Sequence, residues 1–287
     1  MIAHVAEAGE ARGRVVLQLA TGRPSAVAID AAIRIAQAFQ SEIESLFVED
    51  EQLIELSGFP FAREISFSGR TMRAISTSDI ERDMRFVFSE VRRRIEARAR
   101  QAEVPLRQTV VRGEPIKALA AACAECGPWN VVALAEPFTS PGCPPLRQLF
   151  EAVSGTTGLI LVGPAARRTD GPIVLAVEDT DRLSGMLRAA ERLARVNEAE
   201  IIVWLIADDN TALATMEGQA RLLLAGRNDV RLELTEIGHL TPAAMSELLR
   251  RLRAGFIVAQ FGGVVVPGEG DLRPLSAGLE CPLLLVR

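Results

Sequence analysis

The second half of this chain repeats the first at a constant spacing. Residues 31–50 align without a gap with residues 189–208, and each aligned pair is 158 positions apart. Seven of these pairs are identical, and the same register places the apolar run 15–19 over the apolar run 173–177. A repeat of this length is far longer than the period of a solenoid, so it predicts two copies of one domain.

The boundary between the two copies is predicted after residue 168. Residues 164–172 carry two prolines and a glycine, and they follow an apolar run at 159–162 that has the composition of a finished strand. The predicted domains are therefore 1–168 and 169–287. Each is long enough to bury its own core.

Strands alternate with amphipathic helices in both copies, which predicts an α/β fold with a parallel sheet covered on both faces. We expect two tandem five-stranded sandwiches, each with strand order 3-2-1-4-5, packed as a pseudo-dimer within one chain. The predicted strands lie at 14–20, 43–48, 106–111, 129–135 and 159–162, and then near 172–178, 200–207, 230–237, 255–260 and 282–286.

The copies differ after their second strand. Between Asp50 and Leu106 there are 55 residues, whereas between Asp208 and Leu232 there are 23, so the first copy carries an insertion. Its second part, 79–102, has apolar residues at helical spacing and begins with a capping-box pattern, which predicts a long helix. The first part, around 51–79, has no clear period.

Aromatic residues are concentrated in that first part. Phe59, Phe61 and Phe67 lie close to Arg63, in a chain with only 11 phenylalanines. The rings could cap the core beneath the long helix, cover the first copy's strand ends as a lid, or form an apolar patch for a second chain. Aromatic residues beside arginine are typical of protein interfaces, and the last two alternatives give these four residues a functional role.

Composition excludes several classes of partner. The chain has 32 basic and 37 acidic side chains and a net charge of -5, so no long-range field attracts nucleic acid. No apolar stretch is long enough to span a membrane, and the first residues do not form a secretory signal, so we expect a cytoplasmic protein without membrane partners.

No catalytic or metal site is predicted. The pair Cys123 and Cys126 falls in the last turn of a predicted helix, where a thiolate is disfavoured, and no second cysteine pair completes a zinc site. His4 and His239 are the only histidines. They are too few and too far apart in sequence to predict a histidine cluster.

These features resemble the universal stress proteins in a tandem arrangement. The resemblance rests on the opening strands VVLQLA and IVLAVED, on the alanine-rich helix that follows each, and on second strands that end in acid, IESLFVED and IIVWLIADD. The segment VVRGEPIKALAAACAECGPWNVVALAE is similar to the family's glycine turn, helix and fourth strand. The resemblance covers nearly the whole chain and implies the fold.

Nucleotide-binding members of that family have a loop of the form Gly, two residues, Gly, nine residues, Gly and Ser or Thr after the fourth strand. This chain lacks it, because Gly262 and Gly263 in the second copy do not have that spacing. Glu178 stands where the family usually has aspartate, and Asp179 and Asp208 lie at the same predicted edge. These five residues are the candidate ligand site, although ordinary solvated loop ends are the simpler explanation of the acids.

The resemblance implies a cytoplasmic stress-response or regulatory protein without catalysis, which acts by binding a protein partner or a small ligand. A homodimer is compatible with it. The first alternative is a stress regulator that binds ATP or AMP with weak or no hydrolysis, and the second is a structural interaction module with filled pockets. No cofactor is required by the sequence.

Overall fold

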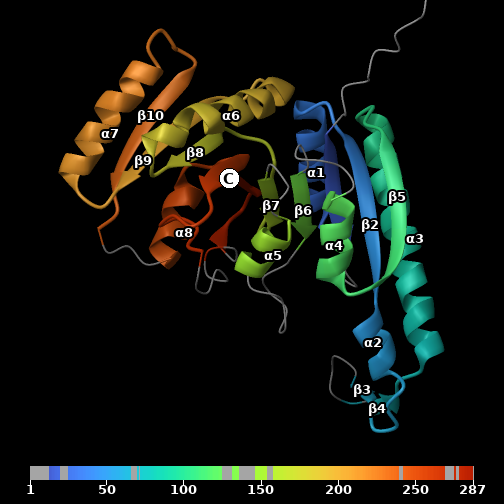
Figure 1. Ribbon diagram of the computed structural model, residues 1–287. Helices are drawn as coiled ribbons and strands as arrows, with labels where there is room; N and C mark the ends of the chain where they lie inside the picture. The colour runs from blue at the N-terminus through green and yellow to red at the C-terminus, as the bar shows by residue number, and fades with distance from the viewer. Residues whose placement is uncertain are drawn as a thin grey trace, which may run out of the picture.

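The computed structural model is shown in Figure 1. It describes residues 13–19, 25–65, 70, 72–124, 131–135, 146–153, 158–238, 242–268, 275 and 278–286.

Each half of the chain supplies five strands to the main sheet, and the first half adds a small hairpin. The elements of the first half are β1 (Arg14–Leu19), α1 (Ala26–Ala38), β2 (Glu42–Asp50), α2 (Glu51–Leu56), β3 (Arg63–Ile65), β4 (Met72–Ala74), α3 (Thr77–Gln101), β5 (Leu106–Gly113), α4 (Pro115–Ala124), β6 (Val131–Ala135), α5 (Leu146–Ala152) and β7 (Gly158–Val162). Those of the second half are β8 (Ile173–Val177), η1 (Thr180–Arg182), α6 (Leu183–Asn197), β9 (Ile201–Ala207), α7 (Asn210–Leu223), β10 (Val230–Glu236), α8 (Pro242–Arg251), β11 (Phe256–Gln260) and β12 (Leu283–Val286).

The main sheet has ten strands in the order β10-β9-β8-β11-β12-β7-β6-β1-β2-β5. All neighbouring strands of the main sheet within one half are parallel. Within each half, the third main-sheet strand in chain order lies at the outer edge, followed by the second, first, fourth and fifth. The buried strands are continuous apolar runs bounded by turn residues, which is why their positions could be predicted to within about two residues.

The prediction of two separate five-stranded sandwiches is wrong. Strands β7 and β12 pair antiparallel, with Leu161 opposite Leu283 and Leu159 opposite Leu285, and this ladder joins the halves into one sheet. Both strands are apolar and would otherwise be exposed sheet edges, which pair readily with other strands. Their pairing inside the chain satisfies both edges at once.

The cores follow the faces of the sheet and not the halves of the chain. Helices α1, α3, α6 and α7 contribute to the core on one face, and α4, α5 and α8 contribute to the core on the other. Each core contains residues of both halves, so the halves share their apolar interior across the junction. Helix α1 packs against α6 across the junction, and the Arg192 guanidinium lies 5.4 Å from the centroid of the Phe39 ring.

The segment between the halves is held in place by the body of the protein. Thr169 is buried, and its carbonyl oxygen accepts a hydrogen bond from Arg34 Nη1 at 2.5 Å. Gly255 donates its N–H to the Pro172 carbonyl at 2.9 Å. The proline and glycine composition of 164–172 therefore marks a packed crossing between halves.

The long helix α3 begins at Thr77 and ends at Gln101, close to the predicted range. The prediction of a capping box at the start of this helix is wrong. The N-cap residue is Ser76, and its side chain makes no capping hydrogen bond. The Ser78 hydroxyl instead bonds the Ser76 hydroxyl at 2.7 Å. Met84, Phe88 and Ile95 lie on the buried stripe of the helix. Among the described helices, none is both long and apolar enough to cross a bilayer.

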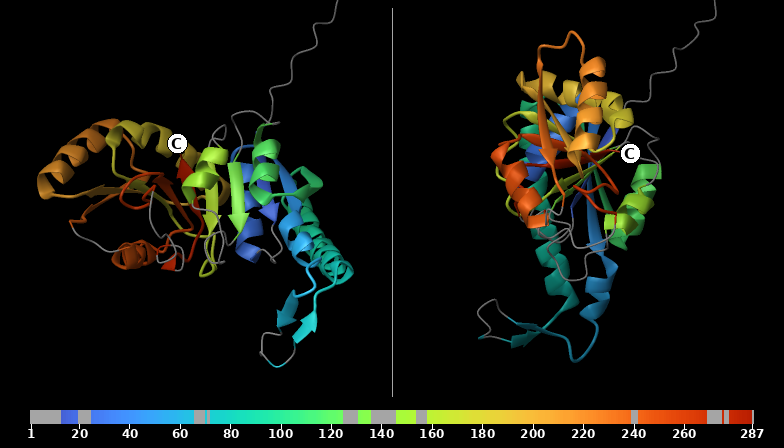
Figure 2. Two further views of the ribbon diagram at one scale, coloured as in Figure 1. Left: turned by 60° about the horizontal axis from the view of Figure 1, so that its bottom comes forward. Right: turned by 90° about the vertical axis from the view of Figure 1, so that its left-hand side faces the viewer.

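The remainder of the insertion projects from the body. Helix α2 continues from the end of β2, and the β3–β4 hairpin extends beyond it, away from the sheet in all three views (Figures 1 and 2). We call residues 51–74 the arm. Strands β3 and β4 pair with Glu64 opposite Arg73 and Ile65 opposite Met72, and every residue in them is exposed.

We predict that Gly255→Ala destabilises the protein by about 1–3 kcal/mol, the usual cost of overpacking. A Cβ at this position would lie 2.6 Å from the Thr169 carbonyl oxygen and 2.9 Å from the Gly171 nitrogen, and both are backbone atoms. Gly218 in α7 is the matched control, because a Cβ there meets no atom within 4 Å. Gly218→Ala should raise stability by about 0.5–1 kcal/mol. Chemical denaturation measures both, and equal effects would contradict the packed crossing.

Candidate functional site

The predicted ligand residues of the second half meet at the carboxyl end of β8. Glu178 follows that strand, and its carboxylate accepts two backbone hydrogen bonds from the loop after β11. Oε2 accepts from Val264 N at 2.5 Å and Oε1 accepts from Val265 N at 2.9 Å. The structure therefore brings Glu178 together with the loop that contains Gly262 and Gly263.

Both glycines are required by this loop. Gly262 has a φ of +87°, which residues with a side chain rarely adopt. Its N–H donates to the Val266 carbonyl at 2.9 Å. A Cβ on Gly263 would lie 2.3 Å from Glu178 Oε2. The loop thus closes around the carboxylate at close range, and its amides bind an anion that the chain itself supplies.

The other predicted acids do not join this site. Asp179 is the N-cap of η1 and accepts from Asp181 N at 2.9 Å. Asp208 is exposed, and it makes no hydrogen bond or ion pair with the residues that the structure describes. Its neighbour Asp209 caps α7 by accepting from Thr211 N and Ala212 N. Within the described ranges, no group of three or more His, Cys, Asp and Glu side chains could hold a metal ion.

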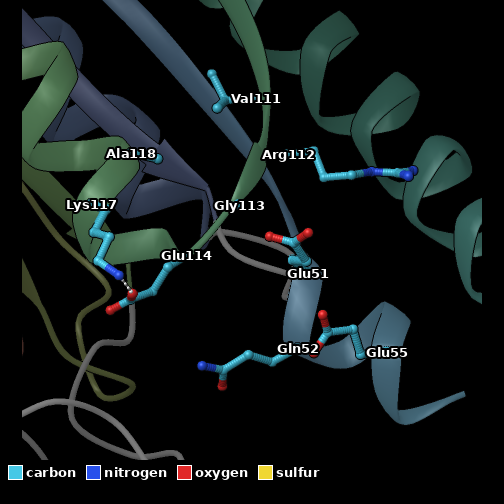
Figure 3. A pocket seen from close by; sticks show the side chains of 9 residues that line it. All are labelled: Glu51, Gln52, Glu55, Val111, Arg112, Gly113, Glu114, Lys117 and Ala118. Carbon is cyan, nitrogen blue, oxygen red and sulfur yellow. Dashed lines mark ion pairs between the residues drawn. The ribbon is translucent and has the colours of Figure 1, made fainter.

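The first half has a cavity at the carboxyl ends of β2 and β5, with a volume of about 490 Å³ (Figure 3). It lies between α2 and the start of α4, and it is lined by Glu51, Gln52, Glu55, Val111, Arg112, Gly113, Glu114, Lys117 and Ala118. This cavity was not predicted from the sequence. Two sequence features lie at this cavity: the Gly113-Glu114-Pro115 turn after a strand, and the insertion that starts at the end of the neighbouring strand. Nothing in the sequence showed that the insertion begins with a helix beside that turn.

The two basic side chains that line this cavity are both paired with acids. Lys117 Nζ lies 2.7 Å from Glu114 Oε2, and this hydrogen bond raises the pKa of Lys117. Arg112 points away toward α3 in Figure 3, where its Nη2 lies 2.8 Å from Glu81 and 3.0 Å from Glu49. Its pKa is raised first by the hydrogen bond to Glu81 and then by that to Glu49. The wall formed by α2 carries Glu51 and Glu55, so the cavity offers little cationic character to a phosphate.

The predicted partner residues lie on the arm. The rings of Phe59 and Phe61 are stacked, with their centroids 5.4 Å apart, and they are 51% and 75% exposed. Neither ring is in the core. Arg63 Nη1 donates to the carbonyls of Pro60 and Ala62, so it fixes the turn that carries the rings. Phe67 lies outside the described residues, as does Cys126; Cys123 is buried.

The fold has close counterparts among solved structures. A universal stress protein from Archaeoglobus fulgidus DSM 4304 matches with a TM-score of 0.59 and 14% identity, over 95% of this chain and 96% of that chain. A functionally unknown protein from Pseudomonas aeruginosa PAO1 also matches with a TM-score of 0.59 and 14% identity, over 96% and 92%.

A third counterpart is part of a transport protein. The cytoplasmic domain of a prokaryotic cation chloride cotransporter matches with a TM-score of 0.58 and 11% identity, over 96% of this chain and 95% of that domain. No family model and no curated protein matches the sequence. At these identities the likeness shows a shared fold, that of universal stress protein structures, over most of the chain.

We predict that Glu178→Ala lowers stability by about 1–3 kcal/mol, because hydrogen bonds to a charged group are lost and the buried Val265 amide loses its acceptor. For a chain of this size, that corresponds to a melting temperature lower by several degrees. Asp208→Ala removes a carboxylate from the same edge of the sheet and should change stability by less than about 0.5 kcal/mol. Equal melting temperatures for the two variants would show that the carboxylate clamp contributes nothing.

Proposed function

We propose that this chain is a non-catalytic cytoplasmic regulator of the universal stress protein type, which acts by binding another macromolecule through its arm. One observation carries the proposal. Eleven large apolar side chains are exposed among the described residues, and five of them lie on the arm. No other part of the described chain concentrates as many of these side chains, and large exposed apolar surfaces are typical of interaction sites.

Two features of the strand ends support a binding role over catalysis. In the second half, the amides of the glycine loop bind the Glu178 carboxylate, so they are not free for a phosphate. In the first half, Glu51 and Glu55 line the cavity, and its two basic side chains, Lys117 and Arg112, are already paired with acids, so this lining offers no unpaired cation to a phosphate.

The second candidate function is nucleotide binding in the first half. The cavity of about 490 Å³ favours it, because open α/β sheets bind ligands at the carboxyl ends of their strands. Lys117 could then exchange its bond with Glu114 for one with a phosphate.

Titration calorimetry with Mg-ATP decides between the two candidates. We predict binding weaker than micromolar for the native protein and for Lys117→Ala, and no phosphate release above background. Micromolar binding that Lys117→Ala weakens would favour the nucleotide function. Binding that appears only in Glu178→Ala would instead show that the second half's loop accepts phosphate once its own carboxylate is removed.

The arm itself is tested with the double variant Phe59→Ser and Phe61→Ser. Because both rings are exposed, we predict a melting temperature within a few degrees of the native value together with the loss of cross-linked partner species in cells. The control is Leu222→Ser with Leu223→Ser on α7, which removes two side chains that are 79% and 53% exposed outside the arm. Unchanged cross-linking in the Phe variant would defeat the arm as the binding element.

A further inference from the structure

The exposed apolar surface of the arm is concentrated. We call Leu56, Phe59, Phe61, Ile65 and Met72 the arm patch; these side chains are 43%, 51%, 75%, 63% and 68% exposed, respectively. They lie within 17 consecutive positions, on an element that projects away from the sheet (Figure 2). Since the arm extends away from the body, the described body does not cover the patch.

Within the part of the chain that the structure describes, the hairpin of the arm lacks a layer that covers its apolar face. Residues alternate between its two faces, so Ile65 and its cross-strand partner Met72 lie on one face, while Glu64 and Arg73 form an ion pair of 2.5 Å on the other. A two-stranded hairpin alone is marginally stable in water, and three or more strands or a covering layer are needed. The apolar face of this hairpin lacks both within the described chain.

Charge on the arm favours an identical partner. Its acids are Glu51, Glu55 and Glu64, and its bases are Arg63, Arg70 and Arg73, so residues 51–74 have no net charge. An element without net charge does not attract a polyanion, an anionic membrane surface or a strongly charged peptide. Equal numbers of both signs allow two copies of the arm to oppose each other with acids facing bases.

The area also fits a dimer. Large apolar side chains carry on the order of 150–250 Å² each, so the exposed fractions of the arm patch amount to roughly 500 Å² of apolar surface per copy. A standard stable interface buries about 800 Å² per partner, little more than half of it apolar. The patch with its surrounding backbone and charged side chains therefore meets the requirement.

We propose that the arm is a dimerisation element, in which the arm patch of one copy packs against the arm patch of a second copy around a two-fold axis. Such an interface is isologous, so one patch serves both partners and the assembly closes at two. The two β3–β4 hairpins would cover each other's apolar faces. This inference rests on the proposed function and specifies its partner.

The test is the mass of the full chain in solution, measured by light scattering and sedimentation velocity from about 1 to 100 µM. We expect a dimer for the native protein. Ile65→Glu places like charges opposite each other at a two-fold interface, and it should raise the dimer dissociation constant on the order of 30-fold or more, as expected for an interface hot spot. Leu222→Glu, at a side chain 79% exposed on α7, is the matched control and should leave the dimer intact.

Position-specific cross-linking supplies the second measurement. Ile65→Cys should form a disulfide-linked dimer under mild oxidation, whereas Leu222→Cys should not. A native chain that stays monomeric over the whole range, or a dimer that Ile65→Glu leaves intact, overturns the proposal.

The two proposals fail in different ways. A monomeric native chain whose cellular cross-links to another protein are lost in the Phe59→Ser and Phe61→Ser variant would overturn the arm-to-arm dimer and leave the proposed function standing. Arm variants that change neither mass nor cross-linking would overturn both.

Discussion

The antiparallel pairing of β7 with β12 is the interaction on which the rest of the structure depends. It turns two strands that would otherwise be apolar edges into the centre of a ten-stranded sheet. Because the sheet is continuous, helices of the two halves share a core on each face, and α1 packs directly against α6. The segment between the halves is then held by Arg34 and Gly255. The halves are therefore coupled by a ladder, by both cores and by their connecting segment.

This arrangement leaves only β5 and β10 as edges of the main sheet. The halves differ at the carboxyl ends of their strands. In the second half, the carboxyl end of β8 is closed by a loop that folds around Glu178. In the first half, β2 and β5 end beside an open cavity, and the chain continues from β2 into the arm. The carboxyl ends of the strands are thus closed by a loop in the second half, whereas in the first half they adjoin an open cavity and a projecting arm.

The loop around Glu178 and the arm patch differ in whether the chain itself satisfies their binding groups. Backbone amides in a glycine loop attract an anion, and here a carboxylate from the same chain satisfies them. The five side chains of the arm patch, by contrast, remain 43–75% exposed, because the hairpin stands clear of the body. The arm patch is therefore the larger unsatisfied surface of the two, and the proposed association is assigned to it for this reason.

The sequence by itself determined the elements and the difference between the halves. Apolar runs between turn residues predicted the ten main-sheet strands, the unequal lengths after Asp50 and Asp208 predicted the insertion, and the cluster around Phe59 and Phe61 singled out the arm. Three features were decided only in the tertiary structure. A strand's sequence does not say whether its edge pairs within the chain, the donors to Glu178 are backbone amides 86 and 87 residues away that have no sequence signature, and exposure of a phenylalanine depends on whether its element folds back on the core. Each of these depends on which distant groups meet, whereas periodicity and turn chemistry report only on near neighbours in the chain.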